Sequence, residues 1–249
     1  MTRLILAAAL SALTLAAPAR ATDLGAMTDA ERQAFRDEVR AYLLENPEVL
    51  VDAMDVLQQR QADQQAAGDA SLVQSNADSI FHDGHSWVGG NPEGDVTLVE
   101  FMDYRCTYCR KSYSEVEELV KSDGNIRFVV KEFPILGEQS ELSARFAIAT
   151  LQMAGDEVYK KAHDTLITFR GKVTKPNLSQ LAGKLGLDAE KVLARMDSPE
   201  VDKVISQNMA LAQRLQISGT PTFVLEDQML RGYVPLDGMR QIVGEVRAD

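Results

Sequence analysis

The only two cysteines in this chain, Cys106 and Cys109, stand two residues apart directly after the apolar run Val96–Met102. A single pair this close together cannot join distant parts of the chain, so the fold must be held by its apolar core. A strand followed by this spacing places one sulfur at a helix N-terminus and the other behind it. The pattern indicates redox chemistry, in which Cys106 attacks and Cys109 resolves.

The first 21 residues are typical of a signal peptide. A charge at Arg3 precedes the apolar stretch 4–18, and the segment closes on Ala19-Arg20-Ala21, the small-x-small pattern of a signal peptidase site. The apolar stretch is shorter than the roughly 20 residues that span a bilayer. We therefore expect residues 1–21 to be removed and the mature chain to be exported, most simply to a bacterial periplasm.

Removal of that segment takes away two arginines and no acids, which changes the net charge from −11 to −13. An acidic surface of this kind argues against nucleic acid or anionic lipid as a partner. The remaining length suits one sizeable domain plus an accessory element.

The accessory element, residues 22–66, is predicted to be a pair of helices. Thr28 and Glu31 form a capping box, and Asn46 with Pro47 starts the second helix. Each helix carries an apolar stripe that so short a segment cannot bury by itself. The periodicity fits packing against another copy of the chain and folding back onto the same chain equally well. Residues 67–87, rich in Gln, Ala, Asp, Ser and Gly, are predicted to form a linker that is helical at first and looser later.

Residues 88–249 are predicted to form an α/β domain. Three strand-like runs, 95–103, 126–133 and 222–230, surround a long helical block, and a helix over 106–121 can serve as the crossover of a right-handed βαβ unit. The helical block forms an insertion over about 138–216, with a closing helix at the C-terminus. The helices are expected at 143–153, 157–169, 177–185, 189–196, 199–215 and 236–246.

A second signal is Gly219-Thr220-Pro221, placed where the helical block gives way to the last strand. A proline at a strand entry is ordinarily a turn device, and only about 5% of X-Pro bonds in folded proteins are cis. In combination with the upstream dithiol, this proline becomes a candidate for the active site.

These residues resemble the thioredoxin-like disulfide oxidoreductases of the DsbA class, in which a CxxC after the first long strand faces a cis-proline across an inserted helical domain. The lead-in Phe-Met-Asp-Tyr-Arg and the N-terminal helical segment are similar to the copper-sensitivity suppressor (ScsC) branch. The resemblance implies a thioredoxin-like fold, assembly as a homo-oligomer through the N-terminal segment, as in trimeric relatives, and isomerase or reductase activity on exported proteins.

Several residues are candidates for the site. The helix N-terminus favours a thiolate at Cys106, and Arg105, Arg110 and Lys111 either support that thiolate or form a solvated helix face. Glu100 lies within an apolar strand, where a carboxylate is costly to bury, and could shuttle the proton of Cys109. The resemblance implies Lys131 as the basic neighbour of Glu100. For substrate binding the candidates are Thr220, Pro221 and Tyr108, with Thr220 pairing with an extended client.

The alternatives are a DsbA-like dithiol oxidase and a copper(I)-binding protein that uses the reduced Cys106 and Cys109 as soft ligands. No other cofactor is expected beyond the redox-active Cys106–Cys109 disulfide. A zinc site built from His82, His85 and the two thiols is less favoured, because the histidines fall in the predicted linker. His163 is expected to be an ordinary surface or boundary residue. We also expect a membrane thiol-redox partner that resets the dithiol.

Overall fold

The computed structural model describes residues 24–248, so the predicted signal peptide lies outside the described residues. The chain divides into two units, Met1–Gln59 and Arg60–Asp249, which are treated separately below. Within residues 24–248, no helix combines the length and the apolar character that crossing a membrane requires.

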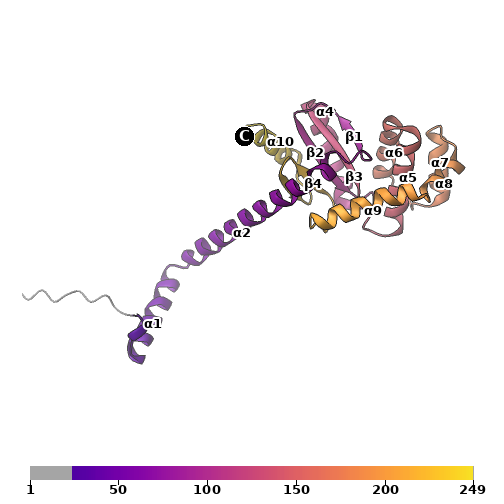
Figure 1. Cartoon of the computed structure of the whole chain (residues 1–249). Coiled ribbons are helices and arrows are strands. Elements are labelled where there is room, and N and C mark those ends of the chain that lie inside the picture. Colours follow the sequence, from indigo (N-terminus) through magenta and orange to yellow (C-terminus); the bar gives the residue numbers. More distant parts are fainter. Residues whose placement is uncertain (1–23, 249) are drawn as a thin grey trace, which may run out of the picture. The chain divides into compact units, whose positions relative to one another are not determined.

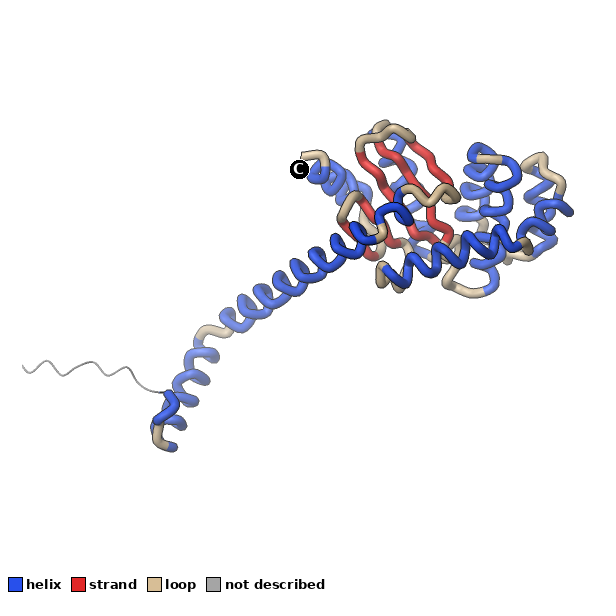
Figure 2. Tube along the Cα trace, viewed as in Figure 1, coloured by secondary structure: helices blue, strands red, loops and turns tan. Residues whose placement is uncertain are grey.

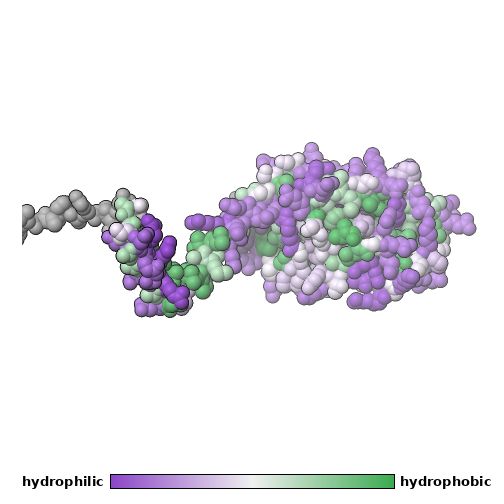
Figure 3. Space-filling model, turned by 90° about the horizontal axis from the view of Figure 1, so that it is seen from below, coloured by the Kyte–Doolittle hydropathy of each residue, from purple (hydrophilic) through white to green (hydrophobic). Residues whose placement is uncertain are grey.

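The N-terminal unit is helical. After a short 3-10 turn (Leu24–Ala26), helix α1 (Asp29–Glu45) starts with the predicted capping box. The Glu31 carboxylate accepts the Thr28 backbone N–H at 2.8 Å, and the Thr28 hydroxyl accepts the Glu31 N–H at 3.3 Å. No residue of α1 is buried. Figure 3 shows apolar surface on this segment, to which Leu44 and Met54 contribute with 69% and 60% of their surfaces exposed.

The prediction that residues 67–87 form a linker is wrong, although the first part of this stretch is helical as predicted. Helix α2 (Glu48–Ser75) runs without a break into this stretch, and α3 (Ala77–Phe81) follows. Alanine and glutamine are good helix formers, so the composition that suggested a linker is compatible with a helix. Val73 and Ile80 are buried in a core cluster, and Asp69 forms an ion pair with Arg231. The end of α2 therefore belongs to the folded domain.

The domain is built on a five-stranded sheet with the strand order β1-β3-β2-β4-β5. Strands β2 and β3 are parallel and are joined through helix α4 (Thr107–Asp123), whereas the other pairs are antiparallel. This is the mixed α/β sheet of the predicted thioredoxin-like fold (Figure 2). The strands are β1 (Trp87–Gly90), β2 (Val96–Met102), β3 (Ile126–Glu132), β4 (Thr222–Leu225) and β5 (Gln228–Arg231).

Two details of the sheet differ from the prediction. The predicted run 222–230 is a hairpin, because the backbone reverses at Glu226, whose φ of 49° lies in the left-handed region. Strand β1 was not predicted, since two of its four residues are glycines and the segment shows no alternation of apolar and polar residues.

The helical insertion between β3 and β4 is present as predicted, and its helices can be followed in Figure 1. The insertion consists of α5 (Glu138–Ala154), α6 (Asp156–Thr168), α7 (Lys175–Lys184), α8 (Ala189–Met196) and α9 (Pro199–Arg214). Two helices lie outside it, α4 (Thr107–Asp123) and α10 (Leu236–Val246).

The two faces of the sheet pack against different layers. One face, with Leu98 and Val130, joins a large core that includes α4, α10 and the insertion. The other face, with Val99 and Phe101, packs against the ends of α2 and α9 and against α3. Because successive side chains of a strand point to opposite faces, this division decides which polar residues of β2 and β3 can meet.

Candidate active site

The dithiol lies where β2 turns into α4. Asp103, which is buried, holds this turn with two oxygens. Its carboxylate accepts the Arg105 backbone N–H at 2.7 Å, and its backbone carbonyl accepts the Cys106 N–H at 3.1 Å. This tight turn makes Cys106 the N-cap residue of α4, and its sulfur accepts the Cys109 backbone N–H at 3.5 Å. An N-cap side chain normally satisfies one of the free N–H groups of a helix start. Here a sulfur takes that position.

The surroundings of the two sulfurs give them opposite acidities. Hydrogen bonds from the Cys109 side chain, the Thr220 side chain and the backbone N–H groups of Cys109 and Tyr108 outweigh the cost of burial and lower the pKa of Cys106 to about 5. Burial, together with its bond to Cys106 and the nearby Glu100, raises the pKa of Cys109 far above its usual value. At neutral pH, Cys106 is therefore a thiolate and Cys109 a thiol.

The loop before β4 faces the nucleophile. The Thr220–Pro221 peptide bond is cis, and the Thr220 carbonyl oxygen lies 3.1 Å from the Cys106 sulfur. Thr220 is half-buried and Pro221 is buried. The structure thus brings Cys106, Cys109, Thr220 and Pro221 together from segments more than 100 residues apart in the sequence.

Glu100 and Lys131 do not form the predicted pair. In the parallel register, Glu100 lies opposite Val130, and Lys131 lies opposite Phe101, so the two charged side chains point to opposite faces of the sheet. Glu100 is buried on the face that contains the dithiol. Burial, with smaller contributions from Cys106 and other acids, raises the pKa of its carboxyl to about 8.

Lys131 has a different role from the one expected. Its ammonium group, which is fully buried, forms an ion pair with Asp83 and donates to the Ser79 carbonyl oxygen at 2.9 Å. Burial opposes ionisation of Asp83, but the Lys131 charge and the hydrogen bonds from Lys131, His85 and Ser86 prevail and lower the pKa of Asp83 to about 2. Lys131 therefore anchors the segment between α3 and β1 to the sheet.

A buried polar cluster behind the active-site turn was not found from the sequence. One Glu132 carboxylate oxygen accepts the Tyr104 hydroxyl at 2.8 Å and the Tyr159 hydroxyl at 2.7 Å, and the Tyr104 hydroxyl lies 3.1 Å from Nδ1 of His163. Burial raises the pKa of Glu132 to about 8 and lowers that of His163 to about 4. The expected surface or boundary position of His163 is wrong, since the side chain is buried between aromatic rings.

This cluster joins three parts of the domain. Glu132 ends β3, Tyr104 belongs to the active-site turn, and Tyr159 and His163 come from α6 in the insertion. The signal for Glu132 in the sequence was the same as for Glu100, a carboxylate at an apolar strand position. The partners of Glu132 lie 27 and 28 residues away, so no local pattern could reveal them.

Basic and aromatic side chains surround the entrance to the site. Arg110 donates to the carbonyl oxygens of Tyr104 at 2.7 Å and Phe169 at 2.8 Å. The exposed Tyr108 ring stacks on Tyr233, and the Lys111 ammonium lies 4.0 Å from the centre of the Tyr233 ring. Tyr108 therefore adds an aromatic surface next to Cys106.

The zinc site considered from the sequence is not formed. His85 lies 3.0 Å from the Asp83 carboxylate and close to Asn208, in the polar surroundings of Lys131. Among residues 24–248, no three histidine, cysteine, aspartate or glutamate side chains gather as a metal-binding group. A two-sulfur site for Cu(I) would need only Cys106 and Cys109, both of which are free thiols here.

Solved structures of known proteins share this architecture. A thioredoxin-like oxidoreductase from Silicibacter pomeroyi DSS-3 is 44% identical, with a TM-score of 0.65, over 69% of this chain and 98% of that chain. ScsC of Proteus mirabilis in a transitional conformation is 25% identical, with a TM-score of 0.65, over 89% of this chain and 97% of that chain.

Two curated proteins match part of this chain in sequence. Disulfide bond formation protein D of Bacillus subtilis (strain 168) is 24% identical over 63% of this chain and 74% of that protein. The Na(+)/H(+) antiporter NhaA of Herminiimonas arsenicoxydans is 30% identical over 58% of this chain, and the match spans 23% of the antiporter's length.

Two family models match the chain. Residues 31–64 match the copper resistance protein ScsC N-terminal domain, and residues 97–244 match the DSBA-like thioredoxin domain. The second match covers more than half of the chain and contains both cysteines and Pro221. The predicted resemblance is confirmed, and this protein belongs to the DSBA-like thioredoxin domain family, with a ScsC-type N-terminal domain.

Proposed function

We propose that this protein is a periplasmic thiol–disulfide oxidoreductase that rearranges or reduces disulfides in exported proteins. The observation that carries the proposal is the contrast between the two sulfurs, with a thiolate at Cys106 and a buried thiol at Cys109. Membership in the DSBA-like family supports the same chemistry. A match to a periplasmic thioredoxin-like protein from Salmonella enterica serovar Typhimurium, at 27% identity, supports the compartment.

In the first step, the Cys106 thiolate attacks one sulfur of a client disulfide. A bond forms between Cys106 and that sulfur, the client disulfide breaks, and the second client sulfur leaves as a thiolate. If that client thiolate attacks another client disulfide and a client thiolate then displaces Cys106, the client is rearranged and the enzyme is restored. No net electrons are transferred in this route.

In the reductive route, Cys109 attacks the Cys106 sulfur of the mixed disulfide. The Cys106–Cys109 disulfide forms, the client sulfur leaves as a thiolate, and two electrons pass from the dithiol to the client. The proton of Cys109 needs an acceptor. The negative charge of Cys106 helps to keep Glu100 protonated. This charge disappears in the mixed disulfide, so the pKa of the Glu100 carboxyl falls and the group ionises more readily. In its carboxylate form, Glu100 can accept the proton of Cys109.

Client binding is proposed to use the Thr220 backbone and the Tyr108 ring. Thr220 is half-buried and lies beside the Cys106 sulfur, so its backbone can pair with an extended segment that bears the client cysteine. Backbone pairing of this kind tolerates many client sequences. A membrane thiol-redox partner is proposed to return the dithiol to its reduced state.

The N-terminal unit is proposed to hold the chains together as a homo-oligomer, with a trimer as the expected form. Its apolar side chains have no buried neighbours within α1, and seven of them, on α1 and the first part of α2, are more than half exposed. Contact between copies would bury these side chains and so stabilise the assembly. The match of residues 31–64 to the ScsC N-terminal domain supports this proposal.

A second candidate is Cu(I) binding by the reduced dithiol, which is favoured by the match of residues 31–64 to the N-terminal domain of the copper resistance protein ScsC. Two adjacent sulfurs suit this soft cation. Titration of the reduced protein with Cu(I) against a colorimetric chelator would support the candidate if the affinity depends on both cysteines. Equal affinity in Cys106→Ser would exclude it.

The proposed activity is tested by trapping. Cys109→Ser, which lacks the resolving thiol, should accumulate mixed disulfides with periplasmic proteins that are released by reductant. Cys106→Ser is the matched control and should trap nothing. If Cys109→Ser also traps no protein, the proposed exchange reaction is wrong.

A further inference from the structure

A cavity of about 400 Å³ lies beside Arg105, the residue that precedes the nucleophile. Its lining comes from the active-site turn, the start of α5 and the loop between α6 and α7. The apolar part includes Leu136 and Leu142, and the charged part includes Arg105, Lys172, Lys175 and Glu138. The cavity therefore combines aliphatic side chains with three basic side chains and one acidic side chain.

Hydrogen bonds fix the walls of this cavity. The Asp103 carboxylate that holds the Arg105 backbone also accepts the backbone N–H of Leu136 at 3.1 Å. On the opposite wall, Arg105 donates to the Gly171 carbonyl oxygen at 3.2 Å, and Gln139 accepts the Val173 N–H at 2.9 Å. Asp103 thus contributes to the cavity wall through its carboxylate and to the position of Cys106 through its backbone carbonyl.

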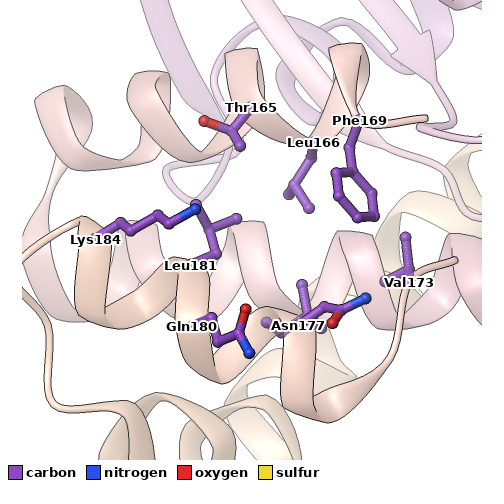
Figure 4. Close-up of a pocket in the computed structure, with 9 residues that line it drawn as sticks. Thr165, Leu166, Phe169, Val173, Asn177, Gln180, Leu181 and Lys184 are labelled. Carbon is purple, nitrogen blue, oxygen red and sulfur yellow. The ribbon is translucent and has the colours of Figure 1, made fainter. Parts of the chain in front are cut away.

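The loop that forms the far wall is anchored from its other side. Val173 is buried in the large core and Phe169 packs against that core; both side chains, with Leu166 and Leu181, also line a separate cavity of about 190 Å³ between α6 and α7 (Figure 4). This anchoring holds the backbone of the intervening residues in place, including that of Lys172. The positive side chains are therefore presented on a fixed backbone.

Most basic side chains around the cavity are not neutralised, although Lys175, which lines it, pairs with Asp197 at 2.8 Å. Arg105, Arg110, Arg170 and Lys172 make no ion pair with a carboxylate within 4.0 Å among the residues that the structure describes. Burial and repulsion from Arg105 and Arg170 lower the pKa of Arg110, which indicates that the three guanidinium groups lie near one another. In a chain with 37 acidic and 26 basic residues, such an unpaired cluster favours an anionic partner.

We propose that this cavity binds the part of a client that flanks its reactive cysteine, and that it selects clients with an acidic residue next to an aliphatic one. The carboxylate would pair with Arg105 or Lys172, and the aliphatic side chain would lie on Leu136 and Leu142. A residue up to three positions from the cysteine can reach about 10 Å from it, so binding here is compatible with attack by Cys106. This inference rests on the proposed function and names its preferred substrates.

The test compares three peptides whose single cysteine is flanked by leucine and by glutamate, glutamine or lysine. Each is supplied as its mixed disulfide with 2-thiopyridine, a neutral leaving group. Cys106 of the full chain carrying Cys109→Ser attacks the peptide sulfur, the peptide–pyridine disulfide breaks, and the released thiopyridone reports the rate. The glutamate peptide should react about three- to ten-fold faster than the lysine peptide at low salt. The ratio should shrink at about 1 M salt.

Variants locate the effect. Lys172→Gln and Arg105→Gln should each reduce the ratio of the glutamate-peptide rate to the lysine-peptide rate. Arg105→Lys, which keeps the positive charge, should retain most of the wild-type ratio. Lys203→Gln, an exposed lysine of α9 outside the cavity lining, should leave the ratio unchanged. A glutamate peptide with serine in place of leucine should react more slowly than its leucine counterpart.

Equal rates for the glutamate, glutamine and lysine peptides would overturn the inference, and so would a rate ratio that persists in the Arg105→Gln/Lys172→Gln double variant. The neutral reagent 2,2′-dithiodipyridine tests the chemistry separately. Reaction with this reagent, but without discrimination among the peptides, would leave the proposed function standing and reject only the docking site. No reaction with any disulfide would overturn the proposed function, and this inference with it.

Discussion

At the scale of single residues, the site depends on placing two identical thiols in different surroundings. Cys106 occupies the start of α4, where hydrogen-bond donors gather, and Cys109 lies one turn further, in the core beside Glu100. A thiolate attacks disulfides, and a buried thiol does not compete with it. The position of each sulfur in the helix thus separates the attacking role from the resolving role.

The first prediction concerns the acidity of Cys106. In Cys109→Ser the serine hydroxyl can replace the donor that contributes most to the low pKa, so the rate of alkylation by iodoacetamide should rise with pH around a midpoint near 5. In Cys109→Ala that donor is lost, and the midpoint should move to higher pH. Midpoints near the ordinary thiol pKa of about 8.5 in both variants would contradict the prediction.

A second prediction concerns Glu132, whose pKa is raised by burial from 4.5 to about 8. Between these values the unfolded chain releases the proton that the folded protein retains, so the contribution of this group to stability is lost as the pH rises through that window. Glu132→Gln cannot ionise. The free energy of unfolding of the wild type should therefore fall relative to that of Glu132→Gln, on the order of 2–4 kcal/mol between about pH 4.5 and 8.

Urea unfolding at a series of pH values measures this difference. The variant is its own control for the fold, because its amide can still accept hydrogen bonds from Tyr104 and Tyr159. A difference between the two proteins that stays constant across the pH range would show that Glu132 is ionised in the folded protein.

At the scale of elements, the sheet separates two buried ionisable groups of the site region, Glu100 and Lys131. The alternation of side chains along β2 and β3 places Glu100 with the dithiol and Lys131 on the opposite face, where it pairs with Asp83. The ion pair attaches the segment after α3 to the centre of the sheet. Its contribution is therefore to the fold rather than to proton transfer.

The third prediction follows from this assignment. Lys131→Met removes one partner of the ion pair and leaves the Asp83 carboxylate, which is only 10% exposed, without its cation. The variant should lose roughly 3–5 kcal/mol in the free energy of unfolding. The double variant Lys131→Met/Asp83→Asn should recover much of that loss in urea unfolding. If the single variant is as stable as the wild type, Lys131 does not serve as this anchor.

Most of the elements could be predicted from the sequence because their signals are local. The predicted capping box is present at Thr28 and Glu31, and the insertion and closing helices lie at or close to the predicted residues. The dithiol and Pro221 have strong signals of their own. Strand β1 and the buried end of α2 could not be predicted, because contacts with distant residues such as Val130 and Arg231 determine them.

Part of the site also escaped prediction for this reason. The sequence indicates that Glu100 sits at an apolar position, but it does not reveal the register of β2 against β3, which decides where Lys131 points. The same holds for His163, whose helical position looks ordinary until Tyr104 and Tyr159 surround it. Contacts between residues far apart in the sequence, rather than residue type, determine where these side chains lie.

At the scale of the whole molecule, a catalytic domain is joined to a helical unit with unburied apolar surface. From Arg60 onward the chain forms a unit of its own, with Val73 and Asp69 buried in it. The N-terminal unit has no comparable core among its described residues. The proposed oligomer follows from this difference.

Our fourth prediction tests that division. A chain that starts at Arg60 should be monomeric in light scattering and should keep the alkylation profile of Cys106, whereas the mature full-length chain should be an oligomer. Leu44→Glu/Met54→Glu in the full chain should weaken the oligomer without shortening the protein. A monomeric full-length chain would show that the apolar residues of the N-terminal unit do not form the interface.

The most direct test of the proposed function is the reactivation of an enzyme whose disulfides have been scrambled, measured with the full-length reduced protein. Our account predicts that activity returns at a rate that depends on Cys106, is lost in Cys106→Ser, and is reduced in the chain that starts at Arg60. A protein that fails to reactivate the scrambled enzyme but oxidises a reduced one would contradict the proposed isomerase and reductase function and identify a dithiol oxidase instead.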